Sequence, residues 1–432
     1  MRDGTHRTLP LREGLPVWSA IAAESFGGPV AQIAVLHRVL VIERRWISEE
    51  RFQRALSFCM LLPGPEAQQL ATYIGWQLHG TWGALVAGSL FVLPGFLALL
   101  ALSLIYVYGG DTRAVAGMLA GIQPVVVAIV AHALPRLARH VAGDRLRVAV
   151  ALGAFLALYF LRLPFPLVLA AAALIGGLRY GRAAMTSISV PPPAATFRYH
   201  RVARTLALWL TIWLLPLIIA WLALGSGHVL VHEGRFFATS AIVTFGGAYA
   251  VLSYVAQEAV HRFHWLTPSE MVTGLGFAES TPGPLIQVVQ FVAFLGAFRA
   301  AAPLEPLSAG IVASLLVTWL TFVPSFMFIL AFGPSVERLA HNARLLGALQ
   351  GISAAVLGAM VNLALWFALH TLFGEVSEIV RGVFRFSAPV PGTLDVIALG
   401  VAVLSYAGLT LRLKHGWLLS AGAAVGLLRA LA

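Results

Sequence analysis

The sequence has very little charge and almost no cysteine. Only 11% of its 432 residues are charged, whereas soluble domains carry about 25%. The mean hydropathy is +0.85. A chain this apolar cannot cover a water-facing surface with polar side chains, which excludes an ordinary soluble protein. Because Cys59 is the single cysteine, an internal disulfide and a paired-cysteine metal motif are excluded as well.

The motifs of common enzymes are also missing from the sequence. It has no Walker loop for ATP, no His-Glu-x-x-His zinc motif and no Gly-x-Ser-x-Gly nucleophile elbow. No polar stretch is long enough to form a soluble enzyme domain. We therefore expect a protein that is not an enzyme, with no catalytic residues, no metal site and no cofactor.

Long apolar stretches dominate what is present. A membrane-spanning helix needs about 20 mostly apolar residues, and the chain offers about thirteen candidate segments. The first and eighth are interrupted by glycine and polar residues, which indicates broken or re-entrant helices. The segments are 16–41, 52–79, 81–108, 114–135, 147–161, 163–179, 205–224, 236–260, 270–298, 306–333, 344–373, 393–411 and 415–431.

A basic, proline-rich stretch divides the chain. It contains Pro191-Pro192-Pro193 and several arginines, a composition typical of an exposed, extended linker. We therefore divide the chain into a first repeat at 1–180, a linker at 181–204, an extra span at 205–232 and a second repeat at 233–432.

The two halves are related in sequence. Four motif pairs share an offset of 219 residues (245 − 26): Phe26-Gly27-Gly28 with Phe245-Gly246-Gly247, Trp46-Ile47-Ser48 with Trp265-Leu266-Thr267, Pro63-Gly64-Pro65 with Pro282-Gly283-Pro284, and Gln68 with Gln287. A second set of matches, between 92–94 and 322–324 and between 117–122 and 347–352, has an offset of 230 (347 − 117), so a small insertion separates the sets. Chance does not hold so many Gly, Pro and Trp residues in one register, which indicates an internal repeat.

The segment count predicts the orientation of the repeats. Equivalent segments lie seven crossings apart, so the second half is inverted relative to the first, as in many secondary transporters. The predicted fold class is an all-α polytopic membrane protein with two homologous, inverted halves and helices broken at Pro-Gly-Pro. The polar, basic N-terminus resembles no signal peptide, and we expect it in the cytoplasm. With this orientation the loops on the inner side carry more arginine and lysine than those on the outer side, as the positive-inside rule requires.

The two Pro-Gly-Pro motifs are the first candidate site. Proline interrupts a helix and suits the first position of a new one. Such a start leaves free N–H groups and a positive dipole end, which bind anions. If the halves are inverted, two of these starts face one another and suit a compact dianion; the alternative is a pair of kinks that shape the bundle. The candidate residues are Pro63, Gly64, Pro65, Gln68, Pro282, Gly283, Pro284 and Gln287.

The paired Phe-Gly-Gly motifs add six candidate binding residues. Adjacent glycines permit positive φ angles and close backbone approach, so they could unwind a helix at the substrate. The alternative is tight packing between helices through small residues. The six are Phe26, Gly27, Gly28, Phe245, Gly246 and Gly247.

Charged residues beside these motifs suggest two further roles. Glu66 follows the first Pro-Gly-Pro and Glu279 precedes the second, so either could couple proton movement to transport, or simply pair with an arginine. Arg38, Arg44 and Arg45 disobey the positive-inside rule in the loop after the first segment. They could attract anions, or form an interfacial belt with a neighbouring tryptophan.

Taken together, these residues resemble the long-chain, two-domain chromate ion transporters. The resemblance rests on the stretches 26–29, 44–48, 59–76, 244–249 and 281–285 and covers about 15–430. It implies efflux of chromate from the cytoplasm and a relation to sulfate, which has the same shape and charge. Sulfate or another oxyanion remains an alternative substrate, and a membrane-embedded enzyme or a structural or sensory protein is the alternative class.

The resemblance also implies where the protein acts and with what. We expect it in the inner cell membrane, driven by the membrane potential or by exchange, and conferring chromate resistance. Its partners are chromate or a sulfate-like oxyanion and the lipid bilayer. We allow for a homodimer and expect no nucleic acid.

Overall fold

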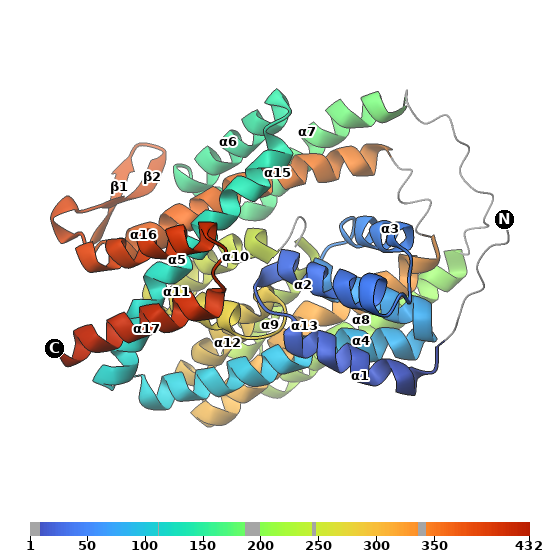
Figure 1. Ribbon diagram of the computed structural model, residues 1–432, viewed down its shortest axis with the longest axis horizontal. Coiled ribbons are helices and arrows are strands. Elements are labelled where there is room, and N and C mark those ends of the chain that lie inside the picture. Colours follow the sequence, from blue (N-terminus) through green and yellow to red (C-terminus); the bar gives the residue numbers. More distant parts are fainter. Residues whose placement is uncertain (1–8, 111, 186–198, 244–247, 336–342) are drawn as a thin grey trace. The chain divides into compact units, whose positions relative to one another are not determined.

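The computed structural model describes residues 9–110, 112–185, 199–243, 248–335 and 343–432 (Figure 1). The chain forms two compact units, and each takes segments from both predicted halves. Unit 1 consists of Met1–Leu100, Ile188–Ala248 and Thr281–Asn342, and unit 2 of Ala101–Ser187, Tyr249–Ser280 and Ala343–Ala432. The division into repeats, linker and extra span remains a prediction.

Unit 1 is helical throughout its described part. Its elements are α1 (Leu11–Glu24), α2 (Gly28–His37), the π-helical turn η1 (Arg38–Glu43), α3 (Glu49–Cys59), most of α4 (Glu66–Gly109), α8 (Tyr199–Leu224), α9 (Val229–Val243), the 3-10 turn η3 (Leu285–Gln287), α12 (Val288–Arg299), α13 (Pro306–Phe332) and η4 (Gly333–Ser335).

Unit 2 contains helices and one small sheet. Its elements are α5 (Arg113–Val141), α6 (Arg145–Tyr159), α7 (Phe165–Met185), α10 (Ala248–Gln257), the π-helical turn η2 (Glu258–Arg262), α11 (Pro268–Ser280), α15 (Ala343–Leu372), β1 (Val376–Arg381), β2 (Phe384–Pro389), η5 (Pro391–Thr393), α16 (Val396–Thr410) and α17 (His415–Leu431).

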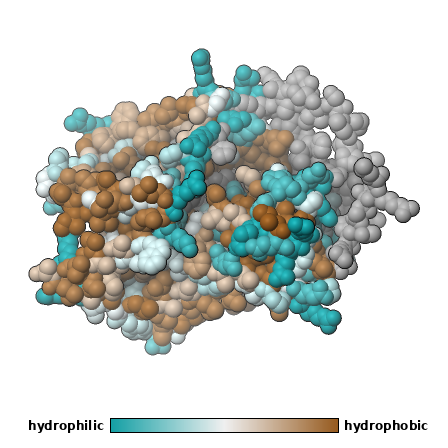
Figure 2. Space-filling model, viewed as in Figure 1, coloured by the Kyte–Doolittle hydropathy of each residue, from teal (hydrophilic) through white to brown (hydrophobic). Residues whose placement is uncertain are grey.

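The predicted multi-pass helical membrane fold agrees with these elements. Five described helices, namely α4, α5, α8, α13 and α15, are long and apolar enough to cross a membrane. Apolar residues cover much of the visible surface, for example over α16 and α17, whereas hydrophilic residues gather over α3 (Figure 2). The count of about thirteen spans and the inversion of the halves remain predictions.

The antiparallel β1–β2 hairpin departs from an all-α fold. It pairs Val376 with Pro389 through to Arg381 with Phe384, and Gly382 has φ 62° in its two-residue turn. A positive φ in such a turn matches the right-handed twist of the strands.

The helices break where the sequence predicts breaks. Helix α3 ends at Cys59, and α4 begins at Glu66 after the first Pro-Gly-Pro; α11 ends at Ser280, and η3 begins at Leu285 after the second. The first apolar segment is likewise divided, between α1 and α2. Within α4, Gly80 has φ 68° and ψ −157°, so the chain turns there, between the two predicted segments 52–79 and 81–108.

The backbone repeats its local structure at the spacing found in the sequence. Arg45 and His264 both have positive φ, 51° and 53°, at the offset of 219 residues (264 − 45). Each follows a π-helical turn closed by equivalent bonds: Trp46 N–H donates to Leu40 O, and Trp265 N–H donates to Ala259 O, both at 2.9 Å. The duplication is therefore visible in conformation as well as in sequence.

Glycines bring helices of unit 2 into close contact. A Cβ on Gly121 would lie 2.1 Å from Gly422 O, which joins α5 to α17, and a Cβ on Gly351 would lie 2.0 Å from Ala172 O, which joins α15 to α7. Small residues permit such backbone approach in membranes, where packing rather than hydrophobic burial holds helices together.

Candidate functional site

Both Pro-Gly-Pro motifs lie in unit 1, and both require their central glycine. Gly64 has φ 129° and Gly283 has φ 109°, a region that residues with a side chain rarely adopt. The proline after each glycine stands immediately before a new helical segment, α4 at Glu66 and η3 at Leu285. Proline fits there because a helix start needs no N–H at that position. The sequence therefore dictates two helix beginnings in this unit.

Each of the two glycines faces a residue of the other half. A Cβ on Gly64 would lie 3.1 Å from Ser325 Oγ, and a Cβ on Gly283 would lie 3.1 Å from Gly95 Cα. Gly95 and Ser325 occupy equivalent positions, 230 residues apart (325 − 95) and directly after a helix proline. The contacts are therefore reciprocal between the repeats, although only one of them presents a hydroxyl group.

The Phe26-Gly27-Gly28 loop meets the second Pro-Gly-Pro motif. Gly27 and Gly28 have φ 82° and 78°, and the turn that they make places Ser25 O where it accepts a 2.8 Å bond from Gly283 N–H. The buried Gln32 side chain donates to Gly283 O. Phe26 itself is exposed. The second copy, Phe245, Gly246 and Gly247, lies outside the described residues.

Three helix beginnings line one small cavity in unit 1. It measures about 10 Å³, the space of about one water molecule. Residues from the N-terminal ends of α2, α4 and η3–α12 line it. These ends carry the positive poles of the helix dipoles, so the wall is suited to negative charge. Its lining residues are Pro29, Gln32, Pro65, Glu66, Ala67, Pro284, Leu285 and Ile286.

Buried amide side chains with unused hydrogen-bonding groups belong to the same segments. Gln68 is 0% exposed, and neither its Nε2 nor its Oε1 has a partner among the described residues. Gln287 Nε2 donates to Gln290 Oε1 at 2.7 Å and to Thr318 Oγ1 at 3.0 Å, whereas its Oε1 has no partner. Buried polar groups without partners are rare and need an explanation, such as a ligand or water.

The sequence reasoning missed two residues beside Gly64. Gln69 Nε2 donates to Pro63 O at 2.6 Å and so holds the first motif in its bent form. Ser325 is 0% exposed, and its Oγ has no partner among the described residues. A signal for Ser325 existed, because it directly follows Pro324 in the second set of repeat matches.

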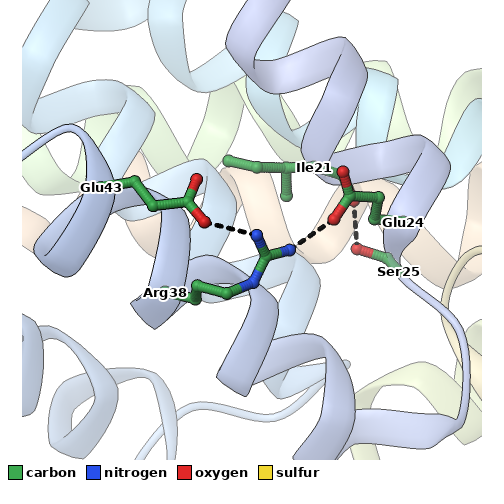
Figure 3. A network of polar contacts seen from close by, with 5 residues as sticks. All are labelled: Ile21, Glu24, Ser25, Arg38 and Glu43. Carbon is green, nitrogen blue, oxygen red and sulfur yellow. Dashed lines mark hydrogen bonds and ion pairs between the residues drawn. The ribbon is translucent and has the colours of Figure 1, made fainter.

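The predicted anion-attracting arginines differ in their surroundings. Arg38 pairs with Glu24 and Glu43, which flank its guanidinium from two sides (Figure 3). Arg44 and Arg45 are exposed, and Arg45 holds the positive φ of the repeated turn.

The two candidate coupling carboxylates lie in different units. Glu66 lines the cavity of unit 1. Glu279 belongs to unit 2, where it is 2% exposed and its Oε2 lies 3.8 Å from His415 Nδ1. Of these two carboxylates, Glu66 alone belongs to the same unit as the Pro-Gly-Pro cavity.

These features define a multi-pass α-helical membrane protein in which broken helices and buried amides form a polar interior. The chain belongs to the chromate transporter family: its residues 15–177 and 233–427 match the family described as "Chromate transporter".

Curated relatives carry the same name. The chain is 32% identical over 356 residues to a "Chromate transport protein" of Pseudomonas aeruginosa, covering 81% of this chain and 77% of the relative. It is 27% identical to a "Chromate transport protein" of Cupriavidus metallidurans, covering 85% of each chain. A "Probable chromate transport protein" of Synechococcus elongatus is 25% identical over 83% of this chain and 84% of the relative. No solved structure matches the chain significantly.

Proposed function

We propose that the protein is a secondary transporter that exports chromate from the cytoplasm across the inner membrane and so confers chromate resistance. The observation that carries this proposal is the convergence of three helix beginnings on one cavity in unit 1. Phe26, Gly27, Gly28, both Pro-Gly-Pro motifs, Gln68 and Gln287 are the proposed binding residues, together with Phe245, Gly246 and Gly247.

The charge at the cavity supports a dianion as ligand. Each helix beginning carries about half a positive elementary charge, so three supply about +1.5. An ionised Glu66 would cancel most of that charge, and a protonated Glu66 would not. We therefore propose that Glu66 takes up a proton when the oxyanion binds, and that Glu279 is a second candidate for proton coupling.

The membrane potential supplies a direction for transport. Moving one charge through 100 mV changes its free energy by about 2.3 kcal/mol, so a dianion gains about twice that amount on leaving a cell whose interior is negative. Export therefore needs no further energy source, whereas uptake would need coupling to another ion. Exposed Arg44 and Arg45 would concentrate anions near the surface, whereas Arg38 is already paired with Glu24 and Glu43.

The small size of the cavity indicates a closed conformation. A tetrahedral oxyanion needs several times the volume of a water molecule, so the helix beginnings must separate before it can enter. The glycines at positions 27, 28, 64 and 283, all with positive φ, are the points at which the broken segments can pivot. We propose that alternate opening of this cavity carries the ion across.

The test is uptake of labelled chromate into everted membrane vesicles, with and without the protein. We expect protein-dependent accumulation in energised vesicles and competition by excess sulfate, which has the same tetrahedral geometry and charge. No protein-dependent uptake by sealed, energised vesicles would overturn the proposal. Faster uptake of labelled sulfate than of chromate would instead assign the protein as a sulfate-type permease.

A further inference from the structure

Unit 2 contains a larger, separate cavity of about 200 Å³. It lies among the end of α6 and the turn that follows it, the end of α10 with the π-helical turn η2, helix α15 and strand β2. Its polar lining residues are Tyr159, Arg162, Gln257, Glu258, His261, Arg262, Asn362 and Ser387, and Leu158 and Trp366 complete the wall.

The floor of this cavity carries an unused amide. Asn362 on α15 is 2% exposed, and its side chain makes no hydrogen bond to any residue that the structure describes. The amide lines the cavity, so its donors and its acceptor are available to a ligand or water there. Trp366, one helical turn further along α15, is also buried.

Two guanidinium groups stand at the rim. Arg162 Nη1 pairs with Glu378 at 2.9 Å, and Arg262 Nη1 pairs with Glu258 at 2.9 Å. Each pair uses one nitrogen, and a guanidinium has five N–H donors. Both arginines therefore keep donors that can form a planar fork around an oxyanion.

The tautomer of His261 adds a further donor. Trp366 Nε1–H donates to His261 Nε2 at 3.2 Å. Because Nε2 accepts that bond, a neutral ring carries its proton on Nδ1. An imidazole held in this form offers an N–H group rather than a lone pair to its other side.

N–H donors line much of this wall, which favours an anion over a cation. Each of its two guanidinium groups pairs with one carboxylate, Arg162 with Glu378 and Arg262 with Glu258, and keeps further N–H donors. The amides of Gln257 and Asn362 and the N–H of His261 add neutral donors. A compact ion with several oxygen atoms can accept from all of these groups, whereas a metal ion would find Glu258 as the one carboxylate of the lining, and that carboxylate is already paired with Arg262.

The cavity also lies where an ion can enter from water. A two-stranded hairpin such as β1–β2 leaves backbone groups on its outer edges, of which Arg385 N–H is satisfied by Phe160 O at 2.7 Å, and such edges cannot face lipid tails. Phe386 of the hairpin packs on Phe160 with ring centroids 5.2 Å apart, and Tyr159 O–H donates to Ser387 O. Aromatic side chains of this kind gather at membrane–water boundaries.

We propose that this cavity is a second binding site for a tetrahedral oxyanion such as sulfate or chromate, distinct from the Pro-Gly-Pro cavity. Arg162, Arg262 and Asn362 hold the ion, and the His261–Trp366 pair orients one further donor. The site does not depend on the transport mechanism, because its recognition groups all belong to unit 2.

Counting bound ions tests the second site. The purified full-length protein in detergent is titrated with labelled sulfate by equilibrium dialysis, for the wild type and for Arg162→Gln and Asn362→Leu. Arg412→Gln is the matched control, since Arg412 is exposed and has a positive φ like Arg162, 64° against 48°. We expect the two cavity variants to lose one bound sulfate per chain, or to bind it about tenfold more weakly, and Arg412→Gln to match the wild type.

The count separates this inference from the proposed function. If the Pro-Gly-Pro cavity also binds sulfate, the wild type holds two ions and the variants hold one; if it does not, the numbers are one and none. In both cases the loss of one ion supports the second site. Wild-type stoichiometry and affinity in Arg162→Gln and Asn362→Leu would overturn it. Asn362→Leu should fold normally, since Asn362 makes no hydrogen bond to a residue in the described part of the chain, and size-exclusion chromatography checks this.

Discussion

Single glycines determine the shape of the proposed transport site. A leucine at Gly64 or Gly283 would face two penalties, an unfavourable positive φ and a side chain directed at Ser325 or Gly95. We predict that Gly64→Leu and Gly283→Leu each abolish chromate transport while protein remains in the membrane. Vesicle uptake and immunoblotting of the membrane fraction measure the two properties.

The matched control for these glycines is Gly153→Leu on α6. A side chain at Gly153 would meet open space, and its φ is not positive, so transport should be retained. Wild-type uptake by both Gly64→Leu and Gly283→Leu would rule out the proposed cavity as the transport site.

Ser325 supplies the one hydroxyl that distinguishes the two reciprocal glycine contacts. Because its Oγ has no partner among the described residues, Ser325→Ala leaves none of them unsatisfied and should not lower stability. We predict about a tenfold rise in KM for chromate, the effect of losing one hydrogen bond to a charged ligand. Ser314→Ala is the control, since Ser314 lies on the same helix α13, is equally buried and also lacks a partner. An equal effect of both variants would show that the change is not specific to the hydroxyl beside Gly64.

Glu66 is the residue at which proton coupling can be tested. Glu66→Gln keeps the shape of the side chain but cannot release a proton, so we predict that transport loses its dependence on pH. Uptake into vesicles clamped at several external pH values measures this, with Glu13→Gln, an exposed position of α1, as the control. If Glu66→Gln and Glu279→Gln both kept the wild-type pH profile, the hypothesis that these carboxylates couple proton movement to transport would be wrong.

At the scale of elements, breaks were easier to predict from sequence than packing. Proline and glycine change the backbone conformation at their own positions, so the interruptions at Pro-Gly-Pro and after Glu24 follow from residue type alone. The β1–β2 hairpin was missed because a search for long apolar runs passes over six-residue strands. Its signal was the alternation of Phe384-Arg385-Phe386-Ser387 shortly after Gly382. Likewise, the reciprocal contacts of Gly64 and Gly283 depend on the tertiary arrangement of unit 1, which no local pattern specifies.

Helix pairing in unit 2 depends on close contact between glycines. Gly351→Leu would place its Cβ about 2.0 Å from Ala172 O, so α7 and α15 must separate. We predict a destabilisation of at least about 1–3 kcal/mol, typical of overpacking, seen as a lower thermal unfolding temperature in detergent. Gly400→Leu on α16 meets nothing within 4 Å and should unfold like the wild type. Equal unfolding temperatures for all three proteins would contradict this view of the packing.

At the scale of the whole molecule, the predicted inversion means that equivalent positions of the two repeats lie on opposite sides of the membrane. The turns at Arg45 and His264 are equivalent, exposed and 219 residues apart (264 − 45). If an odd number of crossings separates them, the two positions lie on opposite sides of the membrane. With the N-terminus in the cytoplasm, Arg45 then faces outward and His264 inward.

Single cysteines can test this inversion directly. The native Cys59 is buried and is the only cysteine, so Cys59→Ser gives a cysteine-free background into which Arg45→Cys or His264→Cys is introduced. We predict that a membrane-impermeant maleimide labels Arg45→Cys in intact spheroplasts and His264→Cys only in everted vesicles. Labelling of both positions from one side would mean that an even number of crossings separates the repeats. The two Pro-Gly-Pro motifs would then belong to parallel rather than inverted halves, and alternating access by exchange of equivalent halves would lose its structural basis.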